Sequence, residues 1–165
     1  MAKNNAMHVK CTDKKTFTLF LNDQVVGVLD YKDSFFLKAD LEIPGSGQYE
    51  IRPQGIFGTR INVTKNEIET ATLKMNWKGQ VVISFPYGQE YVLKSKGFFQ
   101  NIYVLENDMG ESLLQFEPKF NWSKSTYSYT LSYDKAPREI LLVMLALYAA
   151  NYFIAMMTGT MSGEG

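Results

Sequence analysis

The sequence predicts a mainly β protein: a closed antiparallel β-barrel of about 11–12 strands with a hydrophobic C-terminal α-helix through its centre. Three observations support this. Short runs with strand periodicity follow one another from residue 16 to about residue 133, separated by turn residues. The pattern changes once, near Ala136-Pro137, to a long apolar run. The chain has 165 residues, 45% of them hydrophobic, which is enough for one sizeable core.

Apolar and polar residues alternate most clearly in the first and last of these runs. "TFTLFLN" (residues 16–22) and "TYSYTLSY" (residues 126–133) place large apolar or aromatic side chains at every second position. This period of two is typical of a half-buried strand. Nine further runs between them are expected to be strands: residues 24–31, 34–43, 48–52, 59–64, 67–75, 80–87, 90–95, 100–106 and 111–117.

The connections between these runs are short and rich in turn residues. Examples are Pro44-Gly45-Ser46-Gly47, Pro86-Tyr87-Gly88 and Asn107-Asp108-Met109-Gly110. Such turns join antiparallel neighbours and predict an up-and-down sheet. A sheet of this width exposes two long edges unless it closes into a barrel. A barrel wider than about eight strands leaves an interior that needs a plug or a ligand.

The stretch "EILLVMLALYAANYFIAMMTG" (residues 139–159) is a suitable plug. No charged residue follows Glu139 until Glu164, and a helix that is apolar on all sides must be buried in protein or in lipid. We expect a central helix over residues 137–158, with Pro137 in its first turn. Residues 140–157 would form about 27 Å of helix, at the lower edge of what a bilayer core of about 30 Å requires. A tail-anchored protein with residues 140–157 as the membrane span is therefore an alternative.

Three polar side chains favour burial of this helix inside the barrel. Tyr148, Asn151 and Tyr152 fall on one face in the middle of the segment. Lipid would offer them no hydrogen-bond partner, whereas barrel side chains or water would. We expect them to form a buried polar face on the central helix. An enzyme with a ligand site near Asn151 is a further alternative.

Charge and cysteine usage restrict the partners and the compartment. The 17 basic residues balance the 17 acidic ones, so the chain has no net positive charge that would attract nucleic acid. We therefore expect no nucleic acid as a partner. Cys11 is the only cysteine, which points to a reducing compartment. The N-terminal residues contain no apolar signal-peptide core. These features predict a cytoplasmic location, with membrane association as an option.

The chain is expected to form one domain over residues 16–158. Residues 1–15 are expected to be a mobile N-terminal arm, and residues 159–165 a flexible tail. The sequence has no linker that would divide the domain.

Candidate catalytic groups are few. His8 and Cys11 in "HVKC" are the only histidine and cysteine. Two carboxylate pairs, Glu67 with Glu69 and Glu106 with Asp108, have the spacing of residues on one face of a strand, and solvated sheet surface is the simpler explanation. We therefore expect no catalytic residue, no metal site, no cofactor and no enzyme activity.

Two short segments are candidate binding surfaces. Lys14 and Lys15 belong to a basic N-terminal stretch, and "PKFNWSKSTYSYT" (residues 118–130) combines Lys119 and Lys124 with Trp122. Lysine with an exposed aromatic ring is the composition of a lipid-contacting loop. We expect these five residues to bind lipid. The alternatives are a solvated terminus and a hairpin loop in which Trp122 folds back to cap a barrel end.

The order of elements resembles the tubby C-terminal-like superfamily, which includes LURP-one-related proteins and phospholipid scramblases. The resemblance is carried by "GFFQNIYVLENDMGESLLQFE", then "STYSYTLSYDKAP", then the helix "REILLVMLALYAANYFIAMM". The resemblance covers most of the chain and lies in the order of the strands and the helix and in their hydrophobic pattern. It implies a closed barrel threaded by its C-terminal helix, and a role at membranes or phosphoinositides.

Together these observations predict a non-enzymatic module that binds anionic phospholipid or a membrane surface. A protein–protein interaction or scaffold domain, with a protein as the partner, is the alternative.

Overall fold

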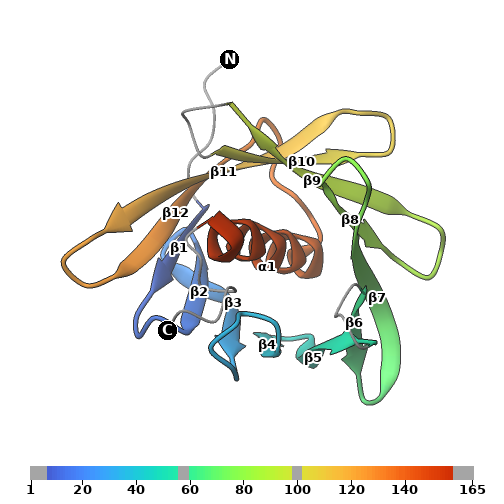
Figure 1. The fold of residues 1–165 in the computed structure, drawn as a ribbon, viewed down its shortest axis with the longest axis horizontal. Coiled ribbons are helices and arrows are strands. Elements are labelled where there is room, and N and C mark those ends of the chain that lie inside the picture. The colour runs from blue at the N-terminus through green and yellow to red at the C-terminus, as the bar shows by residue number, and fades with distance from the viewer. Residues whose placement is uncertain (1–6, 56–59, 98–101, 158–165) are drawn as a thin grey trace.

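The computed structural model describes residues 7–55, 60–97 and 102–157. Within these residues, twelve strands form a closed antiparallel barrel around one helix (Figure 1), which confirms the predicted fold class. The strands are β1 (Met7–Cys11), β2 (Thr16–Leu21), β3 (Gln24–Tyr31), β4 (Ala39–Ile43), β5 (Gly47–Gln54), β6 (Arg60–Lys65), β7 (Ile68–Met75), β8 (Val81–Ser84), β9 (Glu90–Lys96), β10 (Ile102–Asn107), β11 (Ser112–Asn121) and β12 (Thr126–Ser132). The helix is α1 (Ile140–Met157).

Each strand pairs with its neighbour in the sequence, and β1 closes the barrel by pairing with β12. Each of the eleven predicted runs overlaps one of the strands β2 to β12. The side chains alternate as the pattern requires: Phe17 and Leu19 of β2 are buried between more exposed neighbours. At Asn22-Asp23 both residues have positive φ, the backbone of a tight type I′ hairpin turn.

Strand β1 differs from the expectation of a mobile arm over residues 1–15. Met7 and Val9 are buried, and His8 pairs with Thr130 of β12. The run is only five residues long and contains polar residues, so its local signal is weak, but the edges of β2 and β12 would be unpaired without it. Asp13 fixes the following turn by accepting hydrogen bonds from the backbone N–H groups of Lys15 (3.1 Å) and Thr16 (2.7 Å). Residues 1–6 and the expected tail lie outside the described residues.

Helix α1 fills the barrel interior. Twelve of its eighteen residues are buried, and ten of them form one hydrophobic core with the inward-facing residues of the strands. It begins at Ile140, three residues after the expected start at Pro137, and the expected end at residue 158 lies outside the described residues. The helix is long and apolar enough to cross a membrane. In this structure its apolar surface is covered by the barrel, as expected for the central helix, so no membrane span is needed to bury it.

Helix α1 and strand β3 approach each other closely at Gly27. A Cβ atom built there would lie 2.6 Å from Sδ of Met144, which is fully buried. We expect Gly27→Ala to lower the free energy of unfolding by about 1–3 kcal/mol through overpacking, measured by urea denaturation. In a Met144→Ala background the same change should cost much less, because the clashing atoms are gone. Equal costs in both backgrounds would contradict this contact.

Candidate functional site

The predicted polar face of α1 lies in the barrel core, and protein groups satisfy most of it. Asn151 is fully buried; its Oδ1 accepts a hydrogen bond from the Tyr129 hydroxyl (2.7 Å), and its Nδ2 donates to the Tyr31 hydroxyl (3.1 Å). The Tyr148 hydroxyl donates to the backbone oxygen of Leu37 (2.7 Å). Tyr152 is only half-buried, although Ile154 and Ala155 closer to the helix end are buried, so the expectation of a buried Tyr152 is not met.

The buried phenols around Asn151 remain neutral. Burial raises the pKa of Tyr31 and of Tyr129 well above the ordinary value for tyrosine. Burial also raises the pKa of Tyr103, which lies in the same core, to about 12. An acid–base catalyst is most effective with a pKa near the working pH, so this cluster has the properties of a structural hydrogen-bond network.

Three of the candidate catalytic residues have partners other than those that the candidate pairs would give them. His8 and Cys11 are three residues apart on β1, so their side chains point to opposite faces, and the His8 ring stacks on Phe20 at 5.0 Å. Glu69 lies 3.5 Å from Arg60, and Glu106 lies 2.7 Å from Lys94. Within the described part of the chain, no group of three His, Cys, Asp or Glu residues could hold a metal ion.

The up-and-down topology sorts the connecting segments between the two ends of the barrel. Every second strand connection lies at the same end of the barrel. The C-terminal end of α1 lies at one of these two ends, because Ile154 and Ala155 border a cavity together with Cys11 and Phe36. We call this the lysine-rich end. Its described turns carry six lysines against two aspartates: Lys14, Lys15, Lys32, Lys38, Lys78 and Lys124, with Asp13 and Asp33.

The opposite end, where α1 begins, has the reverse charge. Its connecting segments carry six carboxylates against two cations: Asp23, Glu67, Asp108, Glu111, Asp134 and Glu139, with Lys135 and Arg138. The described connecting segments of the two barrel ends therefore carry charge of opposite sign, although the chain as a whole has no net charge.

Exposed aromatic side chains accompany the lysines. Trp77 in the β7–β8 turn is 90% exposed, Trp122 in the β11–β12 turn is 80% exposed, and Phe35 in the β3–β4 connection is 47% exposed. Trp122 stacks on Phe120 at 5.2 Å and points into solvent, so it does not cap the barrel end. Lys78 lies over the Trp77 ring, 5.4 Å from its centroid. Three turns at one end therefore present an aromatic ring beside or near a lysine.

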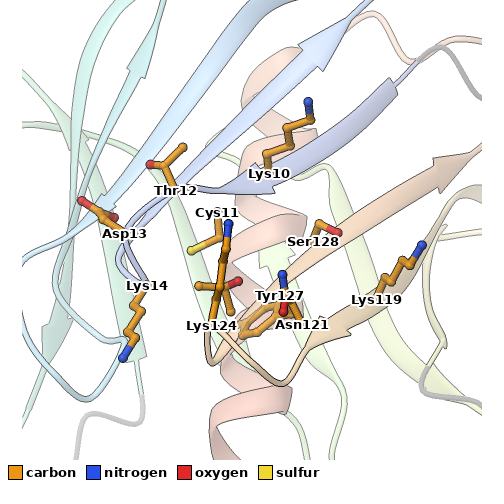
Figure 2. Close-up of a pocket in the computed structure, with 11 residues that line it drawn as sticks. Lys10, Cys11, Thr12, Asp13, Lys14, Lys119, Asn121, Lys124, Tyr127 and Ser128 are labelled. Atoms are coloured by element: carbon orange, nitrogen blue, oxygen red, sulfur yellow. The ribbon is translucent and has the colours of Figure 1, made fainter.

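A cavity of about 560 Å³ lies between the β1–β2 turn and the β11–β12 hairpin (Figure 2). We call it the lysine cavity; it is bordered by Lys10, Lys14, Lys119 and Lys124. In Figure 2 the four ammonium groups are spread around the cavity rather than converging on one point. Within the described residues none of the four forms an ion pair.

The lysine cavity contains one carboxylate, that of Asp13. Hydrogen bonds from the Lys15 backbone and the Thr16 side chain lower its pKa, so it stays charged, and the turn already uses its oxygens. The cavity therefore keeps an excess of positive charge suited to an anion.

A second cavity of about 360 Å³ adjoins the first. We call it the aromatic cavity; its walls include Phe36, Phe120, Trp122 and Tyr127, together with Ile154 of α1. All five residues predicted to bind lipid border one or both cavities. Lys14, Lys119 and Lys124 border the lysine cavity, and Lys14, Lys15 and Trp122 border the aromatic cavity. The prediction did not include Lys10, Phe35 or Trp77.

Comparisons with models of known protein families, with curated proteins and with solved structures gave no match.

Proposed function

We propose that the protein is a non-enzymatic binding module whose lysine-rich end docks on anionic phospholipid at a membrane surface. The observation that carries this proposal is the gathering of exposed tryptophans and lysines at one end, where the four lysines of the lysine cavity form no ion pair with any described residue. A cation near an anionic membrane contributes about 1 kcal/mol, and tryptophan favours the headgroup region. The carboxylates at the opposite end would face away from the membrane and so set the orientation.

The charge distribution also has a structural effect. Lysines near the end of α1 and carboxylates near its start complement the helix macrodipole. That effect is confined to the first and last turns of a helix, however, and it gives no reason for Trp77 and Trp122 to be exposed. Membrane docking accounts for both the cations and the aromatic rings.

The fold supports the same proposal less directly. A closed barrel with a buried C-terminal helix is the architecture that the tubby C-terminal-like resemblance implies, and we propose membership of that superfamily on this basis. Fold likeness is a weak argument for function, so the proposal rests on the site. The corresponding location is the cytoplasmic surface of a membrane.

Neutralising two lysines of the site tests the proposal. We expect Lys119→Gln with Lys124→Gln to weaken binding to vesicles containing phosphatidylserine by roughly thirtyfold, from about 1 kcal/mol per cation. Cosedimentation or titration with the vesicles measures this. Since the attraction is screened by salt, wild-type binding should also fall as the salt concentration rises.

The matched control is Lys135→Gln with Arg138→Gln, which removes two exposed cations from the opposite end. This variant has the same net charge as the test variant and should bind like the wild type. Equal losses in the two variants would show that only net charge matters. No wild-type binding would overturn the proposal and favour the protein-interaction alternative.

A further inference from the structure

The two cavities at the lysine-rich end are continuous in their lining residues. Cys11, Lys14, Asn121, Thr126 and Tyr127 border both. On one side of this junction the walls carry lysines and hydroxyl groups, and on the other they carry aromatic rings and the end of α1. Polarity therefore changes along the site from cationic to apolar, through a junction that offers hydrogen-bond donors.

One junction residue has an unsatisfied donor. The Tyr127 hydroxyl is buried and has no hydrogen-bond partner among the described residues. Its ring is held by Phe17 (5.3 Å) and Tyr129 (5.7 Å), and burial raises its pKa well above the ordinary value, so the hydroxyl keeps its proton. A buried donor without an acceptor is costly, and a ligand oxygen that accepted its hydrogen bond would recover that cost.

Three of the seven described non-glycine residues with positive φ border the aromatic cavity, and the other four lie in the β2–β3 and β6–β7 turns. The three at the cavity, Lys14, Phe36 and Ser125, have φ values of 72°, 58° and 52°. This left-handed region is disfavoured for residues other than glycine, most of all for a bulky side chain such as Phe36. Such conformations cluster at ligand sites, where the surrounding structure maintains them.

We propose that the two cavities form one binding site for a single phospholipid molecule. Its phosphate lies among the lysines, and the first part of one hydrocarbon chain lies in the aromatic cavity. The Tyr127 hydroxyl, buried in the unliganded protein, becomes accessible when the lipid enters and donates a hydrogen bond to the headgroup side at the junction. This deepens the proposed function and rests on it for the class of ligand. The barrel interior is filled by α1, so the site lies at the barrel end rather than in a lumen.

Two water-soluble probes separate the contributions of the head and the chain. Dihexanoyl phosphatidic acid, kept below its micelle concentration, has both parts, whereas glycerol 3-phosphate has only the head. Titration calorimetry should show one lipid molecule bound per protein, at least about tenfold more tightly than glycerol 3-phosphate, since each buried methylene contributes about fourfold. Equal affinities for the two probes would overturn the proposal.

The variant Tyr127→Phe tests the junction. It should weaken binding of the short-chain lipid about tenfold through loss of one hydrogen bond. Because it removes an orphaned hydroxyl, it should leave the melting temperature of the unliganded protein unchanged or raised. Unchanged lipid affinity in a folded variant would remove Tyr127 from the site and overturn the proposal as stated.

Vesicle binding distinguishes failure of this inference from failure of the proposed function. If anionic vesicles bind but the short-chain lipid binds no better than glycerol 3-phosphate, docking on a surface stands and the single-molecule site does not. If neither vesicles nor the short-chain lipid bind, both proposals fail.

Discussion

A chain that ends at Lys135 is expected to lose the barrel fold. Truncation removes all of α1, which contributes ten buried residues to the centre of the hydrophobic core. Burial of one large apolar side chain contributes about 1.5–3 kcal/mol, so the helix contributes more than the whole net stability of a typical domain, about 5–15 kcal/mol. The emptied barrel would also expose its inward-facing apolar residues to water.

High-speed centrifugation without detergent and near-ultraviolet circular dichroism measure this effect. The full chain should stay in the supernatant with a structured aromatic signal, and the truncated chain should aggregate or lose that signal. A truncated chain that is monomeric and keeps the native aromatic signal would show that the barrel folds without its helix.

The second large effect is expected at Asn151. Asn151→Leu removes the acceptor of the Tyr129 hydroxyl and the donor to the Tyr31 hydroxyl while keeping an apolar side chain of similar size. Each buried group left unsatisfied costs about 1–3 kcal/mol, so the free energy of unfolding should fall by about 2–5 kcal/mol. Chemical denaturation of wild type and variant measures the difference.

The control adds Tyr129→Phe and Tyr31→Phe to Asn151→Leu. Removing the orphaned hydroxyls should recover much of the lost stability, since replacing both partners of a hydrogen bond by apolar groups is nearly neutral. Tyr152→Phe, at a half-buried position, should have little effect. An Asn151→Leu variant as stable as the wild type would show that the network does not stabilise the core.

The sequence predicts most of the barrel because strand period and turn residues are local signals. Strands β2 to β12 and the helix follow from them directly. Strand β1 does not, because "MHVKC" is short and its pairing with β12 joins residues more than 100 positions apart. Closure of the sheet was the only available signal, since a closed barrel cannot leave β2 and β12 with free edges.

The candidate site depends on the same long-range pairing. Lys14 and Lys15 lie far in the sequence from Lys119, Trp122 and Lys124, and they meet because β1 pairs with both β2 and β12. The other lysines of the lysine-rich end can be predicted from the topology. In an up-and-down barrel every second strand connection lies at the same end, so the charged residues of the connections at each end can be counted from the sequence. The two cavities and the orphaned Tyr127 hydroxyl depend on side-chain packing, which no local pattern reports.

Trp122 fluorescence tests docking of the lysine-rich end most directly. The chain has two tryptophans, so Trp77→Phe leaves Trp122 as the only one. If the account is right, Trp122 emission shifts to shorter wavelength when vesicles containing phosphatidylserine are added, stays unchanged with neutral phosphatidylcholine vesicles, and returns to its free value in about 1 M salt, where charges are screened beyond about 3 Å. Emission that does not change with the anionic vesicles would contradict it.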